Sequence, residues 1–341
     1  MKAEVKPRIE LENRTKLETV IPLATPFVIF VDPADICNFK CTFCPTGDQD
    51  LMKSVGRPLK VMKFDLYTKI IDDIAEFDQK IKVLRLYKDG EPLLNKKLPQ
   101  MIKYAKDKGV ADKIDTTTNA SALTNERSLA LIEAGLDRIN ISIYGVNEKQ
   151  YKEFSKVNID FKKIVENVKF FYENRKQCEV LVKINGDTLT KDEKQFFLDT
   201  FGDYCDKIFI EHIMGCWPEF EIKGVDINDE FGIYGQEIKE VSVCPYVFYA
   251  FSINSDGSVS TCFLDWARKL IIGNANTQSV KNIWFGEGMK EYRKMFLEGR
   301  RKEHPVCKDC GQLTHGMPDN IDKHSEKLLK KLYPFPKIAL N

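Results

Sequence analysis

Six short apolar runs that favour β-strands alternate with segments of helical periodicity between residues 27 and 213. The expected strands are Phe27–Val31, Val83–Tyr87, Lys113–Thr118, Arg138–Ile143, Glu179–Ile184 and Lys207–Ile213. The expected helices are Phe64–Phe77, Lys97–Lys108, Asn125–Ala134, Phe161–Asn174 and Lys191–Phe201. Repeated strand–helix alternation implies a parallel sheet with right-handed crossovers, and six units are too few to close an eight-stranded barrel. The sequence therefore predicts an α/β fold, a partial (β/α)6 TIM-like barrel.

The alternation ends after Ile213, and shorter elements are expected in the rest of the chain. The Asp256-Gly257 pair supplies the tight turn of a β-hairpin between two apolar runs. The elements expected around and after it are hairpin strands within 247–254 and 259–263, a helix at 280–299, a cysteine-bearing loop at 306–311 and a last helix at 320–332. We therefore predict a small C-terminal α+β domain.

Five parts of the chain follow from this division. They are an N-terminal extension (1–26), the partial barrel (27–215), a connector (216–243), the small α+β domain (244–312) and a final helix with its tail (313–341).

The charge pattern argues against nucleic-acid and membrane partners. The 341 residues include 52 basic and 51 acidic side chains, spread among one another without a basic stripe. No run approaches the roughly 20 apolar residues that a membrane span needs, and the N-terminus has no apolar signal region. We expect a soluble, cytoplasmic protein.

The chain contains ten cysteines, which is unusual for a protein expected in a reducing compartment. Disulfides are rare there, so metal binding or redox chemistry is the favoured explanation. Cys178 and Cys205 flank predicted elements and are interpreted as small buried apolar residues. The other cysteines are clustered.

Three of the cysteines form one loop directly after the first strand, at Cys37, Cys41 and Cys44. In a parallel α/β barrel, functional residues lie on loops at the carboxyl ends of the strands. Three thiolates can hold three irons of a cubane and leave the fourth open, whereas structural zinc usually takes four ligands in paired spacing. The loop therefore predicts an iron–sulfur cluster with one iron free to bind a further ligand.

This loop resembles the signature of the radical S-adenosylmethionine (SAM) superfamily, and further segments in chain order resemble its SAM-binding motifs. The resemblance implies that Lys156 stands where such families often place an arginine for the SAM carboxylate; lysine can pair with it only as a point charge. The positions that the resemblance assigns to SAM binding are Phe43, Gly90, Glu91, Pro92, Asn119, Ser142 and Lys156.

The resemblance also implies a chemistry. The open iron chelates the amino and carboxylate groups of SAM, and an electron from the reduced cluster cleaves the sulfonium. The product is a 5′-deoxyadenosyl radical, which removes a hydrogen atom from an unactivated C–H bond. A flavodoxin or ferredoxin-type reductant is the expected partner.

A second set of four cysteines lies in the C-terminal part, at Cys244, Cys262, Cys307 and Cys310. The spacing alone allows either a [4Fe–4S] cluster or zinc. The region resembles the twitch subdomain, a shortened relative of the SPASM domain of radical SAM enzymes. That resemblance implies one auxiliary cluster, and therefore two [4Fe–4S] clusters per chain.

Residues at the strand ends are expected to line the substrate cavity. Asp89 and Asp187 are candidates for a base that takes a hydroxyl proton. Cys216, just past the sixth strand, is a candidate hydrogen-atom donor, because radical epimerases of this superfamily use a cysteine thiol. His212 lies on a predicted strand and is interpreted as a core residue.

The favoured function is a radical SAM oxidoreductase for a small polyhydroxylated molecule, namely a sugar, aminosugar or cyclitol, free or nucleotide-linked. The region resembles the twitch dehydrogenases that oxidise an amino-cyclitol alcohol, and oxidation, epimerisation and dehydration stay open. Peptide maturation is the alternative, although about 26 residues before the first strand are few for a peptide-binding module. A plain iron–sulfur electron carrier would need neither an open iron nor six β–α units.

Overall fold

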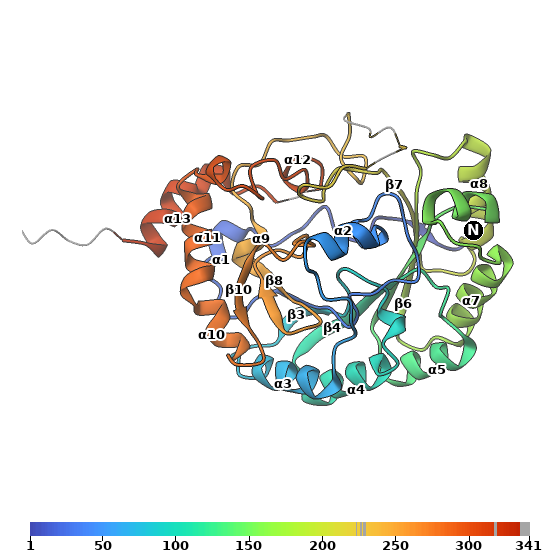
Figure 1. Cartoon of the computed structure of the whole chain (residues 1–341), viewed down its shortest axis with the longest axis horizontal. Coiled ribbons are helices and arrows are strands. Elements are labelled where there is room, and N and C mark those ends of the chain that lie inside the picture. The colour runs from blue at the N-terminus through green and yellow to red at the C-terminus, as the bar shows by residue number, and fades with distance from the viewer. Residues whose placement is uncertain (223, 226, 228–229, 317–318, 335–341) are drawn as a thin grey trace, which may run out of the picture.

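A ten-stranded sheet forms the centre of the molecule in the computed structural model, which describes residues 1–334 apart from 223, 226, 228–229 and 317–318 (Figure 1). The strand order is β1-β7-β6-β5-β4-β3-β2-β8-β9-β10. The strands are β1 (Glu4–Val5), β2 (Val28–Val31), β3 (Ile81–Arg85), β4 (Ala111–Thr118), β5 (Arg138–Ile143), β6 (Glu179–Asn185), β7 (Lys207–Glu211), β8 (Ala250–Ile253), β9 (Ser258–Ser260) and β10 (Ile271–Asn274).

Helices follow the barrel strands and cover the outside of the sheet, as α3, α4, α5, α7 and α8 show in Figure 1. The longer helices are α3 (Phe64–Ile74), α4 (Leu98–Lys108), α5 (Asn125–Glu133), α7 (Phe161–Asn174), α8 (Lys191–Phe201), α11 (Glu287–Leu297) and α13 (Ser325–Leu332). The shorter ones are α1 (Leu17–Val20), α2 (Gln49–Ser54), α6 (Glu148–Gln150), α9 (Tyr246–Tyr249), α10 (Val280–Phe285), α12 (Gln312–His315) and the π-helix η3 (Tyr151–Ser155).

The six predicted barrel strands are confirmed as β2 to β7, and each pairs in parallel with its neighbour in the chain. The predicted bounds of β5, α7 and α8 agree with the structure to the residue. The sheet ends at β1 on one side and β10 on the other, so the barrel stays open as expected.

The C-terminal hairpin continues the barrel sheet. Strand β8 pairs in parallel with β2, with Val28 opposite Ala250 and Val31 opposite Ile253. Strand β9 then pairs antiparallel with β8, which confirms the predicted hairpin around Gly257. The two cysteine-bearing regions are therefore attached to neighbouring strands of one sheet.

Two element predictions were wrong in detail. Val247–Tyr249 was expected in a strand, but it belongs to the helical turn α9, because Pro245 takes a helical conformation that starts a helix. The single helix expected over 280–299 is two helices. Gly286 is extended, with φ −70° and ψ 167°, and it ends α10 and begins α11.

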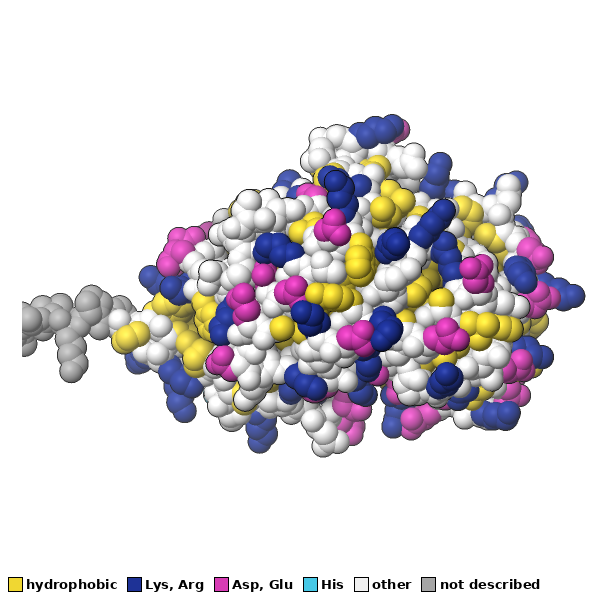
Figure 2. Space-filling view, turned by 90° about the horizontal axis from the view of Figure 1, so that it is seen from below, with side chains coloured by type: hydrophobic (Ala, Val, Ile, Leu, Met, Phe, Trp, Pro, Cys, Tyr) yellow, Lys and Arg dark blue, Asp and Glu magenta, His cyan; other side chains and the backbone are white. Residues whose placement is uncertain are grey.

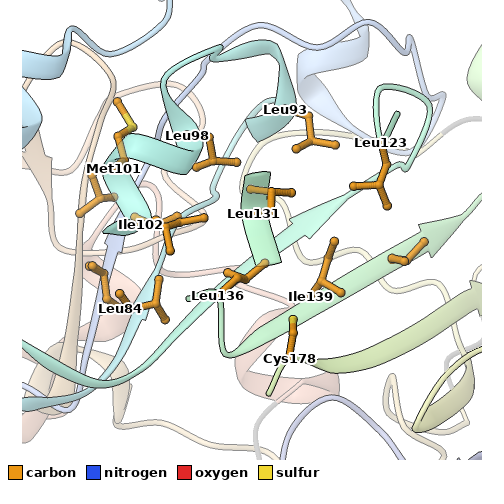
Figure 3. Packing of buried hydrophobic residues seen from close by; sticks show 14 of the residues in the cluster. Leu84, Leu93, Leu98, Met101, Ile102, Leu123, Leu131, Leu136, Ile139 and Cys178 are labelled. Atoms are coloured by element: carbon orange, nitrogen blue, oxygen red, sulfur yellow. The ribbon is translucent and has the colours of Figure 1, made fainter. Parts of the chain in front are cut away.

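The core lies between the sheet and its covering helices. Figure 3 shows Met101 and Ile102 of α4 and Leu131 of α5 packed over Leu84 of β3 and Ile139 of β5. Cys178 and Cys205 are buried, at 2% and 0% exposure, which confirms their interpretation as small core residues.

On β5, the opposite face of the sheet is polar. On β5, Ile139 and Ile141 are fully buried in the core, whereas the alternate residues Asn140 and Ser142 belong to the face turned away from the helices. The alternation of apolar and polar side chains along β5 therefore places polar groups on the inner side of the barrel. Of these, Ser142 reaches the site described below.

The outer surface is mixed in charge. On the face that Figure 2 shows, lysine and arginine side chains alternate with acidic ones, and small apolar areas lie between them. Among the helices that the structure describes, none is long and apolar enough to cross a membrane.

Candidate functional site

The loop of Cys37, Cys41 and Cys44 follows β2 and is fixed by its backbone. The Lys40 N–H donates to Ser155 O and the Thr42 N–H donates to Phe154 O, both at 2.9 Å, so the loop lies along η3. Gly47 also packs tightly here, because an added Cβ would lie 2.4 Å from Cys41 O.

The three thiols suit an iron–sulfur cluster. Burial raises the pKa of each thiol, to about 12 for Cys37, and proximity to Cys44 adds to this for Cys37 and Cys41. Buried neighbouring thiols are stabilised as thiolates where a cation holds them. The Phe39 N–H points at Cys37 Sγ, 3.4 Å away, as backbone donors do toward cluster ligands.

The Gly90-Glu91-Pro92 loop follows β3 and contacts the segment that leads into Cys37. A Cβ on Gly90 would lie 2.2 Å from Ala34 O and 2.3 Å from Ile36 O, so only glycine fits. The buried Glu91 carboxylate accepts hydrogen bonds from Leu93 N, Thr118 Oγ1 and Asn119 N, at 2.7–3.0 Å. The Glu91 side chain therefore links the loop that follows β3 to the end of β4 and the residue after it by hydrogen bonds.

Two further contacts join the loop of Cys37, Cys41 and Cys44 to residues that follow β4 and β5. The Asn119 amide donates to Asn38 Oδ1 at 3.0 Å. Phe43 stacks on Tyr144, which follows β5, with ring centroids 5.8 Å apart and planes 12° apart. Lys156 is exposed and has a left-handed backbone (φ 53°) directly after η3.

The second cysteine set lies together in the C-terminal part of the chain. It consists of Cys244, Cys262, Cys307 and Cys310. Burial raises the pKa of each thiol, and proximity among the four raises it further for Cys244, Cys262 and Cys307. Arg301 holds the loop between Cys307 and Cys310, donating to Cys307 O at 2.9 Å. The Leu264 N–H points at Cys262 Sγ, 3.3 Å away.

Neither cysteine set brings three sulfurs together as closely as a zinc site does. In the described part of the chain, no three cysteine sulfurs lie within 4.8 Å of one another. Tetrahedral zinc with Zn–S bonds of about 2.3 Å would bring its four sulfurs to about 3.8 Å from one another.

A cavity of about 190 Å³ opens at the carboxyl ends of β5, β6 and β7. Lys183 and Glu211 form a hydrogen-bonded ion pair in its wall, and Glu211 Oε1 is buried without a partner among the described residues. The lining residues are Phe43, Ser142, Ile143, Tyr144, Lys183, Ile184, Asn185, Glu211, His212, Ile213, Met214, Cys216, Trp217, Ile222 and Ile233.

Cys216 lies in this cavity wall, beside the CxxC loop of the second cysteine set. A Cβ on Gly311, the residue after Cys310, would lie 2.1 Å from Gly215 O and 3.7 Å from the Cα of Cys216. Burial and then proximity to Cys310 raise the pKa of Cys216 to about 12, and Cys44 adds to this. The thiol therefore keeps its hydrogen at neutral pH.

Asp89, one of the two expected bases, is unsuited to that role. Its side chain is fully buried, 2.6 Å from Lys88 Nζ and 2.9 Å from Arg268 Nη1. Burial alone would raise the pKa of Asp89, but Lys88, Arg268 and Arg57 outweigh it and lower the pKa to about 2. A carboxylate held in this way does not take up a proton at neutral pH.

Asp187, the other expected base, contacts His212, and the interpretation of His212 as a core residue was wrong. Asp187 Oδ1 lies 2.6 Å from His212 Nδ1. The His212 side chain is 32% exposed and lines the cavity, because β7 ends one residue earlier, at Glu211. Strand β7 ends two residues before its predicted end, and this earlier end places His212 outside the strand.

Comparison with known proteins agrees with this geometry. Residues 31–194 match the radical SAM superfamily, and residues 244–311 match the iron–sulfur cluster-binding SPASM domain. A probable GTP 3′,8-cyclase of Methanococcus maripaludis is 37% identical over 120 residues, which are 35% of this chain and 37% of that protein. The chain therefore matches little more than a third of this curated relative.

Two solved structures share the fold. The crystal structure of BtrN in complex with AdoMet and 2-DOIA has a TM-score of 0.55 at 18% identity, over 87% of this chain and 97% of BtrN. The structure of Streptococcus suis SuiB bound to S-adenosylmethionine has a TM-score of 0.60 at 14% identity, over 88% of this chain and 74% of SuiB. The three-cysteine loop, the open barrel and the matched domains together identify the chain as a radical SAM enzyme with a C-terminal SPASM-type iron–sulfur domain.

Proposed function

We propose that this radical SAM enzyme oxidises a carbinol carbon of a small polyhydroxylated molecule, a sugar, aminosugar or cyclitol, free or nucleotide-linked. The observation that carries the proposal is the cavity at the strand ends, which combines polar side chains with an apolar wall and which Cys216 joins to the second cysteine set. A flavodoxin or ferredoxin-type protein is the proposed electron source.

The cavity favours a small substrate. Its volume of about 190 Å³ is below the roughly 300–1,000 Å³ of sites for drug-sized ligands. Asn185 and the free oxygen of Glu211 offer hydrogen-bond partners for hydroxyl or amino groups. Peptide maturation, the alternative, would need a longer groove.

We propose two [4Fe–4S] clusters, one held by Cys37, Cys41 and Cys44 and the other by Cys244, Cys262, Cys307 and Cys310. Sulfurs farther apart than zinc requires, together with N–H donors aimed at Cys37 and Cys262, support clusters over zinc. When bound, the first cluster supplies the electron that cleaves SAM, and the second supplies a one-electron acceptor.

The chain's own residues bind, orient and enclose the reactants. Phe43 and Tyr144 form an aromatic wall between the three-cysteine loop and the cavity. The Lys183–Glu211 pair presents a fixed carboxylate to a substrate hydroxyl or amine.

The relatives point to more than one substrate. The curated relative is named for a reaction of GTP, and the BtrN structure contains 2-DOIA. The match to the cyclase covers about a third of this chain, whereas the fold of BtrN covers most of it. A nucleotide-linked sugar therefore stays within the proposed class.

Epimerisation is the second candidate, because Cys216 places a thiol in the cavity wall. A thiol that donates a hydrogen atom to the substrate radical would return it to the carbon. Turnover in D₂O separates the two reactions: epimerisation gives a product with one deuterium at an inverted carbon, which Cys216→Ala abolishes. Oxidation gives a ketone that Cys216→Ala forms as well as wild type.

The proposed function is tested by anaerobic reduction with SAM and scyllo-inosamine, glucosamine or UDP-glucose as separate probes. We expect one probe to stimulate 5′-deoxyadenosine formation and to lose two hydrogens. A short unstructured peptide serves as the contrasting probe. Stimulation by the peptide alone would contradict the proposal and favour a maturase.

A further inference from the structure

Strand pairing brings His212 and Asp187 together at the mouth of the barrel. Asn185 at the end of β6 stands opposite Glu211 at the end of β7, and Gly186 N donates to Glu211 O at 2.9 Å. Asp187 and His212 are therefore the first residues past this pairing that carry ionisable side chains on the two strands.

The Asp187 carboxylate holds the His212 ring in one orientation. One oxygen lies 2.6 Å from His212 Nδ1, and the other accepts the Ile213 N–H. A carboxylate oxygen accepts hydrogen bonds, so Nδ1 carries a hydrogen, and in the neutral ring Nε2 is then the nitrogen with the lone pair. This is the arrangement by which a carboxylate makes an imidazole a base.

The backbone and a neighbouring ring fix His212 from the other side. Its N–H donates to Ile233 O at 2.9 Å, and Phe231 stacks against the imidazole with centroids 6.5 Å apart. With Nδ1 engaged, the partly exposed ring lines the cavity together with Ser142 and Cys216.

We propose that His212 is the catalytic base, taking the hydroxyl proton of the substrate's carbinol group at Nε2, and that Asp187 is its positioning residue. The proposal rests on the proposed oxidation and assigns its proton acceptor. It also replaces direct catalysis by Asp187, whose two oxygens both have partners within the protein.

The other ionisable groups around the cavity are less suited to this role. Asp89 is held by Lys88 and Arg268, and Glu211 is held by Lys183. In this wall, His212 is the group with a free basic nitrogen.

Atoms and electrons balance in the oxidation. The hydrogen atom on the carbinol carbon is transferred to the 5′-deoxyadenosyl radical, and 5′-deoxyadenosine forms. The hydroxyl proton is transferred to His212 Nε2, and one electron leaves to an oxidised iron–sulfur centre. The C–O bond becomes a carbonyl, and the substrate has lost two hydrogens.

The test compares His212→Ala, Asp187→Asn and wild type with the same three probes, and His324→Ala is the control. His324 is 42% exposed and lies near Glu18, away from the cavity residues. We expect His212→Ala to keep probe-stimulated 5′-deoxyadenosine formation while the ketone formed per 5′-deoxyadenosine falls roughly 100-fold. Asp187→Asn should fall less, because Nε2 remains in place.

Added imidazole separates a base from a structural residue. We expect it to restore ketone formation in His212→Ala and to leave wild type and His324→Ala unchanged. A normal ketone ratio in His212→Ala, or a reduced one that imidazole does not rescue, would overturn the assignment of His212. No ketone from wild type with any probe would overturn the proposed oxidation itself, and the inference with it.

Discussion

Gly311 lies against Gly215 so closely that a Cβ on Gly311 would be 2.1 Å from the carbonyl oxygen of Gly215. This contact joins the loop of Cys307 and Cys310 to the segment that carries Cys216 into the cavity wall. The atom in the way belongs to the backbone, so a side chain there must displace one of the two segments.

Gly311→Ala should therefore destabilise the protein by about 1–3 kcal/mol, as overpacking does. Gly215→Ala is the matched control, because its Cβ would meet only Ile227 Cδ1, at an ordinary 3.8 Å. Anaerobic denaturant unfolding of the reconstituted proteins measures both. Equal stability of the two variants would mean that this contact relaxes without cost.

Replacing Cys37, Cys41 and Cys44 together with alanine should abolish 5′-deoxyadenosine formation. If each set holds one cubane, the variant retains about four irons and wild type about eight. Iron and sulfide analysis with product chromatography tests this, and Cys205→Ala, which alters a buried cysteine outside both sets, is the control. SAM cleavage by the triple variant would contradict the assignment of the first cluster.

Replacing Cys307 and Cys310 with alanine should leave SAM cleavage but uncouple it from product formation. The variant should also be less stable, because a bound metal centre contributes folding free energy. Product per 5′-deoxyadenosine and unfolding by denaturant are the two measurements. A soluble variant that forms product at the wild-type rate would exclude a required role for the auxiliary centre.

Arg268→Ala should cost about 3–5 kcal/mol of stability, because it leaves the buried carboxylates of Asp35 and Asp89 without this partner. Lys269→Ala provides the control one residue away. Lys269 pairs with Glu219 at the surface, where both side chains are more than 40% exposed, and should cost at most about 1 kcal/mol. A difference within experimental error would indicate that Lys88 neutralises Asp89 alone.

Glu211→Gln should weaken substrate binding, because the cavity loses the charge of its fixed acceptor. A hydrogen bond to a charged group is worth roughly 1.5–3 kcal/mol, so KM for the active probe should rise about 10- to 100-fold. Basal 5′-deoxyadenosine formation should not change. Glu219→Gln, at the surface, is the control, and an unchanged KM in Glu211→Gln would remove this residue from substrate recognition.

Local patterns predicted the elements that depend on local physics. Helix α8 begins at the capping box of Thr190 and Glu193, and α7 begins after Asp160, which accepts the Lys163 N–H. The cysteine spacing likewise pointed to the first set, because Cys37, Cys41 and Cys44 lie on one short loop. The missed helix boundaries at Pro245 and Gly286 are also local, whereas other missed features depend on contacts between segments far apart in the chain.

Strand β1 is an example of such a long-range contact. Glu4 and Val5 are too short a run to indicate a strand, and they become one only because Lys207 and Ile208 stand beside them. The pairing of His212 with Asp187 was hidden for the same reason. It requires the register of β6 against β7, which no local pattern contains.

The parallel pairing of β8 with β2 has a consequence for electron movement. Cys37 follows β2 and Cys262 follows the hairpin that β8 begins, so the pairing of these strands would fix the distance between the two proposed clusters. Two domains on a flexible hinge would vary that span with every opening. Here we expect the distance over which an electron tunnels between the proposed clusters to have one narrow distribution. The folded sheet sets this distance, and bound substrate does not change it.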